Sequence, residues 1–88
     1  MTNLKGRWCI LWPDKTTLCA DSATALIDRI AALQWDPCDH AQMRARLTDR
    51  AVVWTGITVA EDTDDAIFLM DLASAGMFAL YTPVTKGV

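Results

Sequence analysis

The sequence predicts an α+β domain: a three-stranded antiparallel sheet packed by three helices, in the order strand, strand, helix, helix, helix, strand. The chain has 88 residues, which suits one domain but not two. Its 52% hydrophobic and 22% charged residues are typical of a globular protein. Short aromatic and branched runs stand near both ends, and apolar residues recur at helical spacing between them. We expect one domain over 1–88, with loose ends at about 1–6 and 84–88.

The first two strands are expected to form a hairpin over residues 8–20. An aromatic and branched run is followed there by Pro-Asp-Lys turn chemistry and a second short run. If Trp12 faces Thr16, then Cys9 lies opposite Cys19 on one face of the hairpin. This register would let the two sulfurs meet.

Cysteine usage favours reduced thiols. Cys9, Cys19 and Cys38 are an odd number of cysteines and have no CxxC spacing, which speaks against a disulfide framework or a zinc site. We expect all three to pack as small apolar residues in a reducing cytosol.

The first two helices are predicted from caps and apolar spacing. Asp21 or Ser22 caps the first helix, which ends near Gln34. Asp36-Pro37 begins the second helix, which runs to about Trp54. The predicted inner stripe of the second helix is Met43, Leu47, Ala51 and Trp54.

The last helix and strand follow an acidic segment. Residues 61–65 are rich in acids, which suit a helix N-terminus, and Gly76 is placed to stop that helix. Residues 77–82 then predict a closing strand that pairs with the hairpin. Residues 51–59 are branched enough to form a strand instead of a helix end, and this alternative stays open.

No pattern in the sequence indicates catalysis, a cofactor or a metal. Cys38, Asp39 and His40 are adjacent, but on a helix such neighbours point in different directions. The chain has no second histidine to complete a zinc site. The acids of 61–65 lack the glycine and the distal glutamate of an EF-hand loop. We therefore expect a protein that is not an enzyme, with a small thiol enzyme at Cys38 as the alternative.

Two sets of side chains remain as candidate binding residues. Tryptophan is enriched at interfaces but also fills cores, so another protein or a second copy of the chain is an expected partner. The tryptophans are Trp8, Trp12, Trp35 and Trp54. The alternative is a nucleic-acid-binding or regulatory module that uses an arginine-bearing helix. Its residues would be Arg44, Arg46 and Arg50, although Asp49 interrupts that face.

The charge balance bears on partners and location. A net charge of −3 disfavours a general affinity for nucleic acid or anionic membranes, which attract basic surfaces. The sequence contains neither a membrane-spanning run nor a secretory signal near Met1, so we expect a cytoplasmic protein.

Three segments resemble small orphan proteins of actinobacteriophages, particularly mycobacteriophages. They are IDRIAAL at 27–33, RAVVWTG at 50–56 and FLMDLASAGMF at 68–78. The shared features are structural, a helix ending in WTG and another ending in AGMF, and no catalytic residue is carried over. The resemblance implies a non-virion role in the cytoplasm of a host cell.

Overall fold

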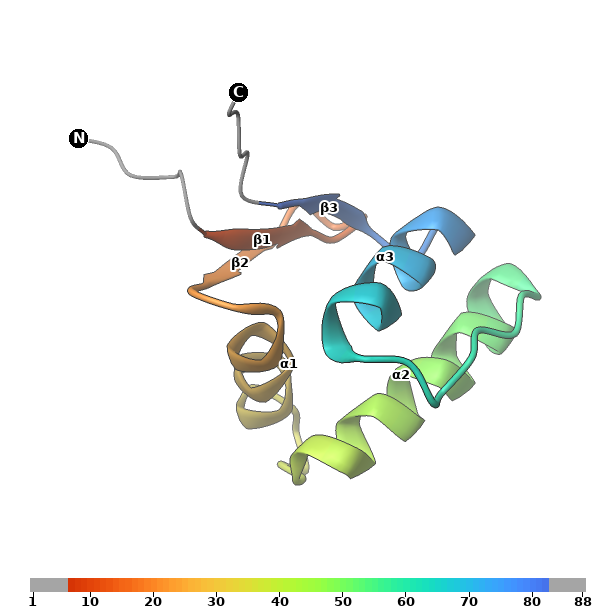
Figure 1. Cartoon of the computed structure of the whole chain (residues 1–88), viewed down its shortest axis with the longest axis horizontal. Coiled ribbons are helices and arrows are strands. Elements are labelled where there is room, and N and C mark those ends of the chain that lie inside the picture. The colour runs from red at the N-terminus through yellow and green to blue at the C-terminus, as the bar shows by residue number, and fades with distance from the viewer. Residues whose placement is uncertain (1–6, 83–88) are drawn as a thin grey trace.

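The sheet and the helices occupy separate layers of the computed structural model, which describes residues 7–82 (Figure 1). The elements are β1 Trp8–Leu11, β2 Thr17–Ala20, α1 Ala23–Ala32, α2 His40–Thr55, α3 Asp65–Ala75 and β3 Ala79–Tyr81. The strands form an antiparallel sheet in the order β2-β1-β3, and the helices lie on one side of it. The predicted α+β fold and element order are confirmed. The loose ends expected at 1–6 and 84–88 lie outside the described residues.

The hairpin has the register that places Trp12 opposite Thr16. Within it, Cys9 pairs with Cys19. The Trp12 N–H donates to the Thr16 carbonyl and the Lys15 N–H donates to the Trp12 carbonyl, both at 2.9 Å. Lys15 has a φ of 76°, the left-handed position of a three-residue hairpin loop.

The expectation of reduced thiols at Cys9 and Cys19 is wrong, because the structure joins the two sulfurs in a disulfide. Residues directly opposite each other on antiparallel strands project to the same face, so the register itself brings the two sulfurs together. The odd number of cysteines in the chain does not prevent this pairing, because the third cysteine, Cys38, lies outside the hairpin. Cys38 keeps its thiol, as expected.

The core lies between the sheet and the helices. Ile10 and Leu18 are buried on the inner face of the hairpin, and Trp12 packs edge-on against Phe78 with 5.1 Å between ring centroids. The helices contribute fully buried side chains from Leu26, Ile27 and Ile30 of α1, Met43 and Leu47 of α2, and Phe68, Leu69 and Leu72 of α3. α1 and α3 contact the sheet, whereas α2 packs on α1 and α3 as the outermost layer (Figure 1).

Most helix ends follow their sequence signals. The Ser22 hydroxyl accepts from the Ala25 N–H at 3.0 Å and so caps α1. Gly56 and Gly76 end α2 and α3 with φ values of 77° and 99°, a conformation that glycine adopts at little cost. Because α2 continues to Thr55, the alternative of a strand over 51–59 is excluded.

The predicted start of the second helix at Asp36-Pro37 is wrong. α2 begins at His40, where the Asp39 carboxylate accepts from the Gln42 N–H at 2.8 Å. The Gln42 side chain accepts in return from the Asp39 N–H at 3.2 Å. This reciprocal capping box satisfies two backbone donors, whereas Asp36 offers the helix a single cap.

None of the three helices described between residues 7 and 82 combines the length and the apolar character needed to cross a membrane.

Candidate functional site

An apolar groove of about 560 Å³ lies between the hairpin turn, the end of α1 and the second half of α2. Its apolar lining consists of Trp12, Pro13, Leu18, Ile30, Leu33 and Trp54. Concave sites of this size with a mostly apolar lining are where proteins usually bind ligands or partner side chains. The groove is therefore the first candidate for a functional site.

The buried stripe of α2 stops before the end of the helix. Met43, Leu47 and Ala51 are fully buried, but Trp54 is 56% exposed although it continues the same stripe. The prediction that Trp54 faces the core is wrong, because Trp54 lies in the wall of an open groove opposite the end of α1 and the hairpin turn.

Two apolar side chains of the groove lining are exposed to solvent. Leu33 at the end of α1 is 66% exposed and Trp54 is 56% exposed, while Val53, next to Trp54 in the sequence, is 79% exposed. Exposed large apolar side chains that line one concave site are typical of an interaction site. Scattered single apolar residues would need no such explanation.

The four candidate tryptophans have different environments. Trp12 and Trp54 line the groove from the hairpin and from α2. Trp8 packs against the core from β1. Trp35 is fully exposed and lies outside the groove lining. The structure thus brings two of the four together.

The polar side of the groove is held by Gln34 and Arg50. The Gln34 amide nitrogen donates to the Ile30 carbonyl at 3.0 Å, which fixes the side chain against the end of α1. Its amide oxygen accepts from Arg50 Nη2 at 2.7 Å. Gln34 therefore positions the guanidinium of a half-buried arginine in the groove wall.

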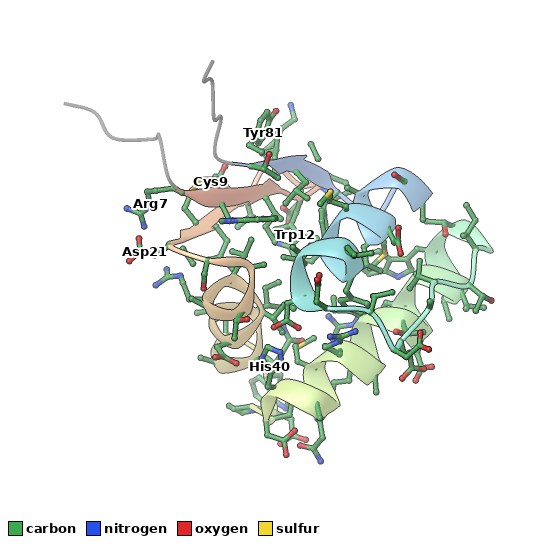
Figure 2. All side chains as sticks on the ribbon, viewed as in Figure 1. Arg7, Cys9, Trp12, Asp21, His40 and Tyr81 are labelled. Carbon is green, nitrogen blue, oxygen red and sulfur yellow. A yellow bond between two sulfur atoms is a disulfide. The ribbon has the colours of Figure 1, made fainter. Side chains whose placement is uncertain are left out.

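A second cluster, which we call the polar clamp, joins the three helices and consists of Asp28, His40, Arg44 and Asp65. His40 lies where the start of α2 approaches α1 (Figure 2). Its Nδ1 is 2.7 Å from Asp28 Oδ1, and its Nε2 is 3.0 Å from Asp65 Oδ1. Only the imidazolium has a proton on both nitrogens to donate to both carboxylates.

Arg44 links the polar clamp to the segment before α3. Its Nη1 donates to Asp65 at 2.9 Å, and its Nη2 donates to the Glu61 and Thr63 carbonyls at 2.7 Å each. The guanidinium also stacks 4.3 Å from the centroid of the Phe68 ring. Arg44 thereby ties α2 to α3 and to the loop before it.

The pKa values of His40 and Asp65 are shifted toward the charged forms. Burial is the largest influence on His40 and lowers its pKa, but the hydrogen bonds and charges of Asp28 and Asp65 outweigh it and raise the pKa above 6.5. Burial alone would raise the pKa of Asp65. Hydrogen bonds from Thr24, His40 and Arg44, with the histidine charge, lower it instead.

The adjacent Cys38, Asp39 and His40 point to different partners, as the spacing predicts. The Cys38 Sγ lies 3.9 Å from the Met43 Sδ, Asp39 caps α2, and His40 belongs to the polar clamp. Within residues 7–82, no three side chains of the His, Cys, Asp or Glu type are grouped to hold a metal.

The three arginines of the nucleic-acid alternative are held by internal contacts. Arg44 is buried in the polar clamp. Arg46 donates to the Asp36 carbonyl at 2.8 Å and lies 3.4 Å from its carboxylate, while Arg50 bonds Gln34. These contacts leave no common row of guanidinium groups for a phosphate backbone.

A comparison of the chain with protein-family models, with curated proteins and with solved structures found no match in any of the three.

Sequence reasoning missed the contribution of Leu33 and Gln34 to the groove and the polar clamp as a whole. The apolar run Val52, Val53 and Trp54 at the end of the second helix, which is too wide for one inner stripe, was the available signal for the groove. Asp28, His40 and Asp65 are distant in sequence, and no local pattern joins them.

Proposed function

We propose that this chain is a non-enzymatic accessory protein that binds a protein partner through the groove, the partner being a host factor or a second copy of the chain. The observation that carries the proposal is the half-exposed Trp54 facing Trp12 across an apolar groove. Large aromatic side chains in a partly desolvated concave site, with polar groups at the rim, are typical of interface hot spots.

The proposal includes a phage origin and action in the cytoplasm of an actinobacterial host. Its support is the resemblance of the segments 27–33, 50–56 and 68–78 to small actinobacteriophage proteins. Reducing systems in that compartment would act on the Cys9–Cys19 disulfide. Because these cysteines alternate with the inward-facing Ile10 and Leu18, opening the disulfide leaves the groove side chains in place.

A pair of tryptophan variants tests the proposal in an affinity capture from actinobacterial lysate read by mass spectrometry. Trp54→Ala removes a groove wall, whereas Trp35→Ala removes an equally large side chain that is fully exposed outside the groove. We expect a specific protein to be captured by the parent chain and by Trp35→Ala but lost with Trp54→Ala. Circular dichroism and melting curves verify that both variants are folded.

Two other capture results would contradict the proposal. Capture that survives Trp54→Ala and is lost with Trp35→Ala would contradict the groove as the binding surface. Recovery of nucleic acid in place of protein would contradict the proposed class of partner. Sedimentation velocity with the same variants tests for a second copy as the partner: self-association that depends on Trp54 selects it over a host factor.

A further inference from the structure

We infer that the groove accepts a peptide segment of the partner that presents a large apolar side chain next to an aspartate or glutamate carboxylate. This inference rests on the proposed function and adds the chemistry of what is bound. Two properties of the groove support this inference: its apolar lining and the guanidinium of Arg50, which has no carboxylate partner.

The groove has the volume for a large side chain, about 560 Å³. Ile30 and Leu18 line it with only 1% and 9% exposure, and Trp12 and Trp54 line it from different elements. A leucine, phenylalanine or tryptophan side chain placed there would cover the half-exposed Trp54 ring. Burial of that apolar surface supplies the main attraction.

The positive charge of Arg50 lacks a matching negative charge. Arg7, Arg44 and Arg46 each lie within 4.0 Å of a carboxylate, whereas Arg29 and Arg50, among residues 7–82, do not. Arg29 is exposed on α1 outside the groove lining, and Arg50, within the lining, has the neutral amide of Gln34 as its side-chain partner. That single bond uses one donor of Nη2 and leaves further N–H donors on the guanidinium. A carboxylate is the group that this planar donor set fits best.

The acidic residue in the groove lining does not neutralise Arg50. Asp14 lies on the hairpin turn, and its carboxylate accepts from the Thr16 N–H at 2.9 Å. Asp14 is exposed on the turn, and none of the ion pairs described among residues 7–82, which reach to 4.0 Å, joins it to an arginine nitrogen. The Asp14 carboxylate belongs to the hairpin, while Arg50 remains available on the helical side.

Gln34 orients the Arg50 guanidinium without neutralising its charge. By bonding both the Ile30 carbonyl and Arg50, Gln34 holds the guanidinium against the end of α1 without cancelling its charge. A carboxylate in the same place would form an internal ion pair. The neutral amide positions the arginine for an external anion at a lower entropy cost, since the side chain is already ordered.

Selection from a display library of random 12-residue peptides tests the inference with the intact chain as bait. Enriched peptides are then synthesised, and their affinities are measured by fluorescence anisotropy for the parent chain and for Arg50→Gln, Arg50→Lys, Trp54→Ala and Trp35→Ala. Each titration is repeated at about 0.05 M and about 0.5 M salt, which screens exposed charge pairs to different degrees.

We expect enriched peptides in which a large apolar residue stands beside Asp or Glu. Arg50→Gln should weaken their binding by about 10-fold or more, Arg50→Lys by less, and high salt should reduce the difference. Replacing the acidic residue of the peptide with its amide should weaken binding to the parent chain by the same factor. On Arg50→Gln, that replacement should have little further effect, which identifies the two groups as partners.

Three results would overturn the inference, and they have different consequences for the proposed function. Apolar peptides that ignore Arg50→Gln but require Trp54 would remove the acidic specificity and leave the groove as a protein-binding site. Peptides that bind equally to Trp54→Ala and the parent chain would remove the groove as well. The absence of any enriched peptide would exclude a linear segment as the occupant, and the lysate capture would then decide independently whether a folded partner binds.

Discussion

The two halves of α2 use their arginines in opposite ways. In the first half, Arg44 has a carboxylate, two carbonyls and an aromatic ring as partners, all within the chain. In the second half, Arg50 has one neutral amide and lies beside the half-exposed Trp54. The two arginines are six residues apart on one helix, yet one is part of the polar clamp and the other is part of the groove wall.

The difference comes from what faces each half of the helix. In the first half, His40 and Arg44 are half-buried where α2 meets α1 and α3, so their polar groups need partners inside the protein to offset the cost of desolvation. In the second half, Arg50 and Trp54 border the open groove, so water can reach them. The N–H donors of Arg50 and the apolar surface of Trp54 that make no contact inside the protein are therefore free to contact a partner.

The largest expected effect on stability comes from replacing the two arginines in parallel. Arg44→Gln should lower the free energy of unfolding by about 3 kcal/mol, because it leaves the Asp65 carboxylate and two carbonyls short of a donor in a largely buried site. Arg50→Gln should change it by less than about 0.5 kcal/mol, since the guanidinium makes one bond to a neutral group. Urea denaturation of both variants measures the contrast.

Equal losses from the two substitutions would contradict the division of α2 into a structural half and a binding half. Arg46→Gln is a further control on the same helix, because its ion pair with Asp36 is largely exposed and should be worth about 1 kcal/mol or less.

Reduction of the hairpin disulfide is expected to change the stability of the protein but not its binding at the groove. Reduction of the Cys9–Cys19 bond should lower stability by about 2.5 kcal/mol, since it opens a loop between cysteines ten residues apart in sequence and restores freedom to the unfolded chain. Binding at the groove should be unchanged when measured well below the melting temperature. Melting curves and peptide titrations with and without a phosphine reductant give both quantities.

A melting temperature that is insensitive to the reductant would show that the hairpin is stable without the cross-link. A loss of binding without unfolding would instead show that the disulfide positions Trp12, which follows β1 and lines the groove. Cys38→Ser provides a control for effects of the reductant on the remaining thiol.

The smallest effect concerns the pH dependence of the polar clamp. Because the pKa of His40 is raised in the folded state, its protonated form favours folding. This contribution is complete below the unfolded pKa of 6.5 and is lost as the pH rises through the higher folded value. The stability difference between the parent chain and His40→Gln should therefore shrink between about pH 5.5 and about pH 8.5.

Denaturation titrations at several pH values follow this difference directly. A difference that stays constant over the range would mean that His40 does not donate to both Asp28 and Asp65 in solution. Groove binding should not follow the same pH profile, because Arg50 keeps its charge throughout the range.

Local chemistry predicted most of the fold from the sequence. Ser22, Gly56 and Gly76 mark helix ends that the structure confirms, and the turn residues set the hairpin register. The start of α2 was misplaced because Asp36-Pro37 and Asp39 are competing signals, and the reciprocal bond with Gln42 favours the second.

The groove was less predictable because it depends on how elements end relative to one another. Helical periodicity puts Trp54 on the inner stripe, but periodicity does not say where the neighbouring helix stops. The polar clamp forms where three helices meet, so no local sequence pattern predicts that His40 lies between Asp28 and Asp65. The groove and the polar clamp both depend on tertiary packing.

Site-specific photo-crosslinking tests the central claim that partners bind at the groove. The photoreactive residue p-benzoylphenylalanine would be placed either at Leu33, which lines the groove, or at Ile67, which is exposed on α3 outside it. We predict that irradiation of the complex links the partner to position 33 and not to position 67, and that Arg50→Gln reduces the yield at position 33. Crosslinks from position 67 alone, or a yield at position 33 that Trp54→Ala leaves unchanged in a folded protein, would contradict the account.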